Sequence, residues 1–261
     1  MLLGARTCWQ WLKILAVCCI LCGCWAKRVQ VPGHPVDAGW TKRVITEEEL
    51  SSLAKRDPTL DLPACYDILG RLNIKARYHI RKAIENGEKL KVPNDFGSFR
   101  GWTPLPNSIR EASEMPKFIL IAKDVPFLGW YEKGKLVGDT PVCIGKRWDW
   151  TKAGSYKVIE KDVDHYSQSY PDESGRPTPM PWALRIYGRV WIHAGDVFTP
   201  YRSHGCINVP LEPAQALFQW AEVGTPVLVL DYLEDLQINN WARRSDASQD
   251  YTSADLPGRR P

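Results

Sequence analysis

The pattern of apolar and polar positions divides the chain into four stretches of different character. Residues 1–26 combine basic residues with an apolar run, and residues 27–116 show helix-type spacing interrupted by Pro and Gly. Residues 117–233 contain short apolar and alternating runs, as in β-strands, whereas residues 234–261 are polar and lack apolar periodicity. The pattern predicts an N-terminal signal, a linker with a helical accessory region, a β-rich domain and a disordered tail.

The accessory region is predicted to contain short helices. Thr46 and Glu49 form a capping box that opens the first helix, and a second helix follows Pro63. A third is predicted over residues 74–86, with Gly87 as its C-terminal cap. Two Pro- and Gly-containing segments are predicted to be a linker and a connector, residues 27–40 and 91–116.

The region after residue 116 changes to β-type patterning. The run Phe118–Ile121 is apolar throughout, and Lys133-Gly134 lies between two alternating stretches, which predicts a hairpin. Further strands are predicted over residues 154–159, 183–186, 189–193 and 227–230. One helix is predicted between Pro213 and Gly224. These elements predict a β-rich, mostly antiparallel domain.

Composition excludes several classes of protein. The 261 residues are 44% hydrophobic and 25% charged, which excludes wholesale disorder and collagen-like or coiled-coil repeats. The formal net charge of +4 is too small and too dispersed to predict a nucleic-acid partner.

Five of the eight cysteines fall within the first 24 residues. There, Arg6 and Lys13 precede an uncharged run over residues 14–25, which as a helix would span about 18 Å, less than the hydrocarbon core of a bilayer. This is the pattern of an export signal. Leu21-Cys22-Gly23-Cys24 resembles a bacterial lipobox, with Cys24 as the lipid-bearing residue.

Two other interpretations of this segment remain open. Cys24-Trp25-Ala26 also fits a small-x-small signal-cleavage site, and a stretch counted from Cys8 would serve as a single-pass anchor. All three place the rest of the chain outside the cytoplasm, where disulfides form. Cys65 and Cys143 are therefore either a disulfide pair or two buried free thiols, and the sequence does not decide between them.

The candidate chemistry lies in residues 191–208. His193 ends an apolar strand, and Cys206 follows His204 and Gly205. The thiolate of a cysteine is the nucleophilic form, and an imidazole accepts its proton and returns it to a leaving amine. Gly205 permits a sharp turn, which would direct backbone amides towards a developing oxyanion.

These residues also fit other interpretations. A cysteine beside a histidine is often structural, and His193, His204 and Cys206, with Asp196 as a fourth ligand, would also fit a zinc site. A papain-type peptidase is disfavoured, because in that class the nucleophilic cysteine precedes its histidine.

The segment Ser203-His204-Gly205-Cys206-Ile207-Asn208, preceded by Ile192-His193, resembles the active-site signature of the L,D-transpeptidase (YkuD-like) catalytic domain. The resemblance extends from about residue 117 to residue 231. It includes the flanking features Gly145, Thr151-x-x-Gly154-x-Tyr156, Met180-Pro181-Trp182 and Gly224-Thr225-Pro226-Val227. Two departures are a short loop of nine residues between His193 and Ser203, and the displaced glycine of His193-Ala194-Gly195.

The resemblance implies a β-sandwich with one or two helices, and a role for each matching residue. Cys206 would be the nucleophile and His193 the general acid and base, with the Ala194 carbonyl orienting the His193 ring. Ser203 and His204 would shape the site, and Gly205 with Cys206 would supply the oxyanion amides. Weaker candidates for substrate contact are Asn208, Arg202, Arg185, Trp182 and Tyr156, whereas Trp191 fits core packing better.

The implied reaction is acyl transfer on peptidoglycan in the periplasm, without metal or organic cofactor. Cys206 would form a thioester with a stem tetrapeptide, release D-Ala and transfer the acyl group to an amine, giving a 3→3 cross-link. Water as the acceptor would make the protein an L,D-carboxypeptidase, and loss of activity would leave a wall-binding module. The acceptor, the oligomeric state and the role of residues 41–115 are not determined by the sequence.

Overall fold

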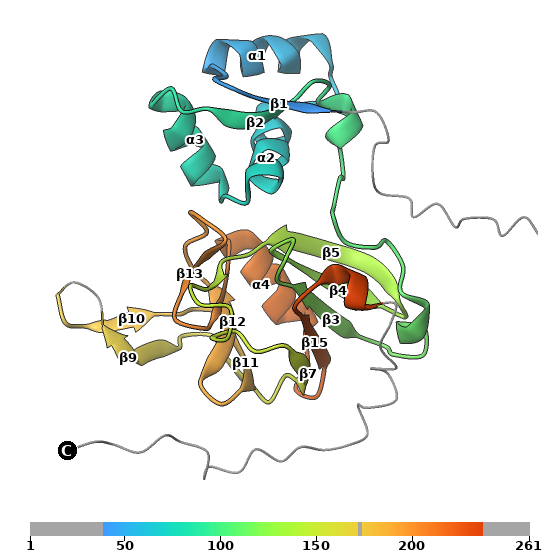
Figure 1. The fold of residues 1–261 in the computed structure, drawn as a ribbon, viewed down its shortest axis with the longest axis vertical. Coiled ribbons are helices and arrows are strands. Elements are labelled where there is room, and N and C mark those ends of the chain that lie inside the picture. Colours follow the sequence, from blue (N-terminus) through green and yellow to red (C-terminus); the bar gives the residue numbers. More distant parts are fainter. Residues whose placement is uncertain (1–38, 172–173, 237–261) are drawn as a thin grey trace, which may run out of the picture. The chain divides into compact units, whose positions relative to one another are not determined.

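The computed structural model describes residues 39–171 and 174–236, all within one compact unit of the chain (Figure 1). The predicted signal, the lipid-bearing Cys24, the first part of the linker and most of the polar tail lie outside the described residues. No helix in the described part of the chain is long and apolar enough to cross a membrane.

The accessory region contains the three predicted helices and a ribbon that was not predicted. The helices are α1 (Glu47–Arg56), α2 (Leu62–Asn73) and α3 (Arg77–Glu85). The Thr46 hydroxyl accepts a hydrogen bond from the Glu49 amide at 3.2 Å, which confirms the predicted start of α1. Strands β1 (Trp40–Arg43) and β2 (Leu90–Pro93) pair antiparallel, so the ends of the predicted linker and connector are structured.

The third helix begins three residues later than predicted. Ile74 has a φ of 51°, a left-handed conformation that ends α2 and prevents continuous helix into α3. The amide of Lys75 then donates to the Gly70 carbonyl at 3.0 Å. At Gly70 a Cβ would lie 2.8 Å from the Lys75 carbonyl oxygen, so this close approach requires glycine.

The β-rich domain contains short strands and one α-helix, which confirms the predicted fold class. Its strands are β3 (Phe118–Ala122), β4 (Phe127–Glu132), β5 (Lys135–Pro141), β6 (Ile144–Gly145), β7 (Gly154–Lys157), β8 (Glu160–Asp162), β9 (Tyr166–Pro171), β10 (Pro177–Pro179), β11 (Ala183–Tyr187), β12 (Val190–Ala194), β13 (Tyr201–Ser203), β14 (Ile207–Val209) and β15 (Pro226–Leu230). The α-helix is α4 (Leu211–Trp220), and short 3₁₀ turns are η1 (Gly97–Phe99), η2 (Arg110–Ala112) and η3 (Leu233–Leu236).

A five-stranded sheet has the strand order β5, β4, β3, β15, β7. The predicted hairpin is confirmed at Lys133 and Gly134, whose φ angles of 46° and 73° suit a tight turn between β4 and β5. Successive side chains of β3 point to opposite faces of the sheet, and both faces are covered. The apolar run Phe118–Ile121 is explained by this double burial, since connector residues from Leu105 to Ala112 cover the outer face.

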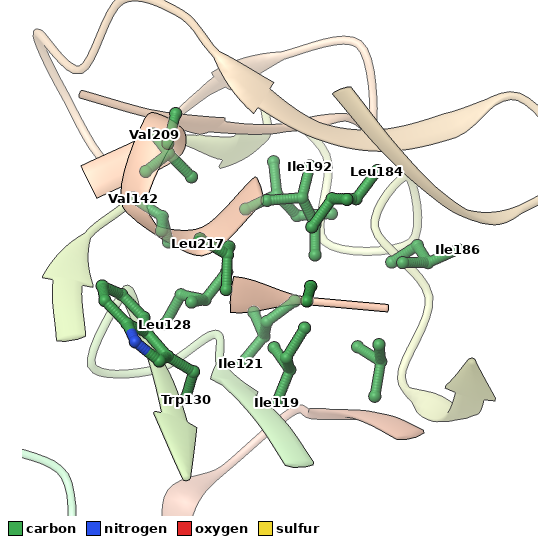
Figure 2. Packing of buried hydrophobic residues seen from close by; sticks show 14 of the residues in the cluster. Ile119, Ile121, Leu128, Trp130, Val142, Leu184, Ile186, Ile192, Val209 and Leu217 are labelled. Carbon is green, nitrogen blue, oxygen red and sulfur yellow. The ribbon is translucent and has the colours of Figure 1, made fainter. Parts of the chain in front are cut away.

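The second sheet, of order β14, β12, β11, β8, packs against the first across the main hydrophobic core. Figure 2 shows Ile119, Ile121 and Leu128 of one sheet opposite Leu184 and Ile192 of the other, with Leu217 of α4 beside them. Most strand pairs are antiparallel, but β12 with β14, β6 with β13 and β3 with β15 are parallel. The sheet that contains β12 and β14 positions the candidate site.

Cys65 and Cys143 are free thiols, both buried. Cys65 belongs to the core of the accessory region, and Cys143 precedes β6 in the β-rich domain. The alternative in which they form a disulfide is therefore wrong for this structure.

Candidate functional site

The parallel pairing of β12 with β14 brings the signature residues together. In this register His193 lies opposite Asn208 and Ile192 lies opposite Ile207. The isoleucines belong to the core between the sheets, so their neighbours His193 and Asn208 lie on the other face. Cys206 directly precedes β14 and packs beside Trp191, which lies on the same face of β12 as His193 because side chains alternate along a strand. Cys206 and His193 thus lie towards the same face of the β12–β14 pair.

His193 is held in one tautomer by the backbone. Its Nδ1 atom lies 2.8 Å from the carbonyl oxygen of Ala194, so Nδ1 carries the proton and Nε2 keeps its lone pair. The side chain is 6% exposed, and burial lowers the pKa of His193 to about 4. The hydrogen bond to Ala194 raises this pKa and the nearby charge of His165 lowers it, both by less than burial does. The ring is consequently neutral at pH 7 and able to accept a proton.

Cys206 lies in an apolar environment beside Met180, Ala183 and Trp191. Burial raises the pKa of the Cys206 thiol above its ordinary value, and a backbone hydrogen bond involving Trp191 offsets part of this rise. The sulfur lies 3.7 Å from the carbonyl oxygen of Arg189, a distance typical of a weak S–H donor. The resting pair is therefore a neutral thiol and a neutral imidazole rather than a thiolate and an imidazolium.

The turn that presents Cys206 is fixed by hydrogen bonds to its backbone. The Ser203 hydroxyl donates to the Cys206 carbonyl at 2.6 Å and accepts from the Gly205 amide at 3.1 Å. Gly205 has a φ of 125°, and a Cβ there would lie 2.9 Å from the carbonyl oxygen of Trp150. Because the Gly205 amide already serves Ser203, an oxyanion role for it would require exchange of this hydrogen bond.

Thr151 supports the same turn from below and was given no role by the sequence. Its buried hydroxyl accepts from the Gly145 amide at 3.0 Å and donates to the Gly205 carbonyl at 2.8 Å. One side chain thus ties strand β6 to the signature turn. The resemblance includes Thr151, but its neighbouring residues do not indicate a bridge to Gly205, which lies 54 positions further along the chain.

His204 is occupied by aromatic stacking. Its ring lies between Tyr170, at a centroid distance of 3.9 Å and an interplanar angle of 8°, and Trp150, at 5.7 Å and 22°. This arrangement fits a residue that shapes the site and leaves the proton transfer to His193. Tyr170 belongs to β9 and was not identified from the sequence.

The displaced glycine of His193-Ala194-Gly195 has a steric reason. At Gly195, a Cβ would lie 2.9 Å from Asn208 Cγ and 3.1 Å from His193 Cε1. Asn208 itself donates through Nδ2 to the Asp196 carbonyl at 3.1 Å, which is a local backbone contact. Asn208 thus supports the loop, and its weaker candidate role in substrate contact stays a prediction.

The remaining weak candidates have partners within the protein. Arg185 Nε lies 2.7 Å from Glu160 Oε2, a charge contact without good hydrogen-bond alignment, and Arg202 lies over the Phe198 ring. Trp182 packs edge-on against Phe218 at 5.4 Å, beside the main core. Tyr156 stacks on Tyr187 at 4.3 Å and donates to the Lys152 carbonyl. Trp191 is buried, as expected of a core residue.

A metal site is not formed by these groups. Within residues 39–171 and 174–236, no three His, Cys, Asp or Glu side chains are arranged to hold a metal ion. The four residues of the zinc alternative therefore do not form such a group.

Comparison with known proteins agrees with the sequence resemblance. Residues 116–229 match the model of the L,D-transpeptidase catalytic domain. A curated relative, probable L,D-transpeptidase 3 of Mycobacterium tuberculosis, is 30% identical over 104 residues, covering 35% of this chain and 38% of that protein. The chain thus spans well under half the length of this relative.

Solved structures of proteins named L,D-transpeptidases match part of the chain. An L,D-transpeptidase from Stackebrandtia nassauensis is 22% identical, with 46% of this chain and 57% of that chain covered at a TM-score of 0.41. The catalytic domain of an E. faecium L,D-transpeptidase acylated by ertapenem is 31% identical, with 44% and 97% covered at a TM-score of 0.37.

Proposed function

We propose that the protein, whose residues 116–229 match the model of the L,D-transpeptidase catalytic domain, uses Cys206 for acyl transfer on peptidoglycan stem peptides. The observation that carries the proposal is the neutral, tautomerically fixed His193 on the same sheet face as Cys206. The family assignment supports the substrate class, and the site geometry supports the chemistry.

In the first half-reaction, the Cys206 sulfur attacks the carbonyl carbon between the third residue of a stem tetrapeptide and its terminal D-Ala. His193 Nε2 takes the thiol proton as the sulfur–carbon bond forms, because the raised pKa of Cys206 leaves little thiolate at neutral pH. The same proton passes to the nitrogen of the leaving D-Ala as the amide bond breaks. A thioester and free D-Ala result.

In the second half-reaction, a side-chain amine of another stem attacks the thioester carbonyl. His193 accepts a proton from the attacking nitrogen and returns it to the Cys206 sulfur, which restores the resting pair. The product is a 3→3 cross-link. Ser203 and Thr151 hold the turn in place during both steps, because each hydrogen-bonds its backbone directly.

The proposal places the protein in the bacterial periplasm. The basic and apolar pattern of residues 1–26 supports export, and Cys24 is the residue that would carry a lipid anchor. Mass spectrometry of the mature N-terminus from membranes would identify a lipid on Cys24, a cleaved signal or an intact segment.

The decisive experiment measures the exchange of D-Ala for another D-amino acid on a purified tetrapeptide, together with intact mass after a carbapenem is added. We expect the wild-type chain to catalyse exchange and to gain the mass of one carbapenem on Cys206. Cys206→Ala should form no adduct, with exchange slower by about 10⁴-fold or more. Cys65→Ala is the matched control, because its thiol lies in the core of the accessory region and should leave the adduct intact.

Different outcomes separate the alternatives. Exchange at the wild-type rate in Cys206→Ala would refute the proposal. D-Ala release without a cross-linked or exchanged product would identify water as the acceptor. Binding to isolated cell wall, with neither exchange nor adduct, would identify an inactive wall-binding module.

A further inference from the structure

The connection between β12 and the signature motif is held by the accessory region. Within the compact unit of the chain, the Ala76 amide donates to the Val197 carbonyl at 2.7 Å. The Lys75 ammonium donates to the Phe198 carbonyl at 3.1 Å and lies 4.1 Å from the centre of the Phe198 ring. Two consecutive loop residues are thus bound by the segment between α2 and α3.

His79, in the first turn of α3, makes the third attachment. Its Nε2 atom is hydrogen-bonded to Asp196 Oδ1, and its ring lies edge-on to Phe198 at 4.9 Å. The His79 side chain is 17% exposed, whereas that of Asp196 is 60% exposed. The histidine is therefore fixed by its own surroundings and restrains a residue that would otherwise face solvent.

The loop is also attached on its other side to the strands of the site. Asn208 Nδ2 donates to the Asp196 carbonyl at 3.1 Å, and Asn208 lies opposite His193 in the β12–β14 pair. Asp196 consequently lies between the accessory helix and the strands that present His193 and Cys206. A movement of α3 would therefore be transmitted to the sheet through Asp196.

We propose that His79 is a positioning residue for the acyl transfer, and that the accessory region holds residues 196–198 so that His193 and Cys206 keep their productive geometry. The inference rests on the proposed function and assigns residues 75–79 a role that the sequence left open. Rates of such reactions are sensitive to small displacements, because misplacement of about 1 Å costs on the order of 100-fold.

The test compares full-length His79→Ala, His79→Gln and Lys82→Ala with the wild-type chain. We expect His79→Ala to lower kcat for D-amino-acid exchange by about tenfold with little change in KM, because geometry rather than substrate binding is lost. His79→Gln keeps a side-chain donor towards Asp196 and should recover most of the activity. Lys82, exposed on the same helix, is the matched control and should leave kcat unchanged.

A second variant and a second measurement distinguish a positioning role of His79 from a folding defect and from failure of the proposed function. Asp196→Ala removes the exposed partner and should lower kcat similarly, with no further loss in the double variant with His79→Ala. The rate of Cys206 alkylation by iodoacetamide reports the site without any assumption about substrate. A change in alkylation rate in His79→Ala supports the inference even where wild-type exchange is absent and the proposed function fails.

Unchanged kcat and unchanged alkylation rate in His79→Ala would overturn the inference. Additive losses in the double variant would also overturn it, because they would show that His79 and Asp196 act separately.

Discussion

At the scale of single residues, burial sets the ionisation of both proposed catalytic groups in opposite senses. It lowers the pKa of His193 and raises that of Cys206, so each group favours its neutral form. The Ala194 carbonyl then selects the tautomer that leaves Nε2 unprotonated. In the proposed reaction the thiol proton is therefore transferred during attack, in contrast to cysteine enzymes that store a thiolate.

Because the pKa of His193 is lowered, the rate of acylation should fall only at unusually low pH. Protonation removes the base as pH falls through the folded-state pKa of about 4. We expect the rate constant for carbapenem acylation to change little as pH falls from 7 to about 5, and to drop as pH approaches that value. Stopped-flow or quenched mass measurements would check this. A midpoint near 6.5 would show an imidazole that ionises as if exposed.

The lowered pKa of His193 should also make the free energy of unfolding depend on pH, which tests the same shift independently of activity. Only the unfolded chain gains the His193 proton between its ordinary pKa of 6.5 and the folded value of about 4, so the contribution is present above pH 6.5 and is lost as pH falls towards 4. The loss amounts to roughly 3 kcal/mol from this residue. The His193→Gln variant should lack this part of the decrease in the free energy of unfolding at acid pH.

At the scale of elements, the site is built where short strands end in turns. Strand β6, the Thr151 hydroxyl and the signature turn form a continuous set of hydrogen bonds below Cys206. A parallel strand pair aligns His193 with this turn, and the loop between them is short enough to be held at three consecutive residues. Thr151 is a side chain outside the signature segment that supports the turn directly.

Thr151→Val should weaken both the fold and the reaction. Valine preserves the shape but leaves the buried Gly145 amide and Gly205 carbonyl without this partner, at about 1–3 kcal/mol for each. We expect a lower free energy of unfolding by denaturant and slower carbapenem acylation. Thr140→Val is the matched control, because Thr140 is equally buried but donates only to the adjacent Pro141 carbonyl. Equal effects of the two variants would contradict the assignment.

Much of this arrangement could be predicted from local signals. The capping box at Thr46, the Lys133-Gly134 turn and the apolar run of β3 each encode their element in adjacent residues, and the signature motif identifies Cys206 and His193. The ribbon of β1 with β2 could not be predicted, because its strands are four residues long and pair across nearly fifty residues. The contacts of Thr151, Tyr170 and His79 with the signature likewise depend on chain topology rather than on neighbouring sequence.

At the scale of the whole molecule, the accessory region and the β-rich domain are joined by a largely buried ion pair. Arg71 of α2 is paired with Asp139 of β5, and the two side chains are 19% and 13% exposed. Arg71 also donates through Nε to the Trp102 carbonyl at 2.8 Å and lies over the Phe127 ring. One side chain thus joins the helical region, the connector and the five-stranded sheet.

Removing one member of this pair should lower the free energy of unfolding by more than breaking an exposed ion pair does. Asp139→Ala leaves the Arg71 charge without its partner, and we expect a loss of about 3–5 kcal/mol in the free energy of unfolding. The double variant Arg71→Met with Asp139→Leu should recover much of this loss. Asp67→Ala, which breaks the exposed pair with Arg77, should cost less than about 1 kcal/mol. Chemical denaturation of the three variants would check the order.

The central position of β15 has a consequence for how the protein folds. This last strand lies between β3 and β7, and Val227 pairs with Ile119 across more than a hundred residues of chain. Such distant pairing forms slowly, and β7 has no other neighbour in its sheet. The five-stranded sheet therefore closes only after almost the entire chain has emerged. Until β15 is in place, the main core between the two sheets lacks Val227 and Val229 and is incomplete.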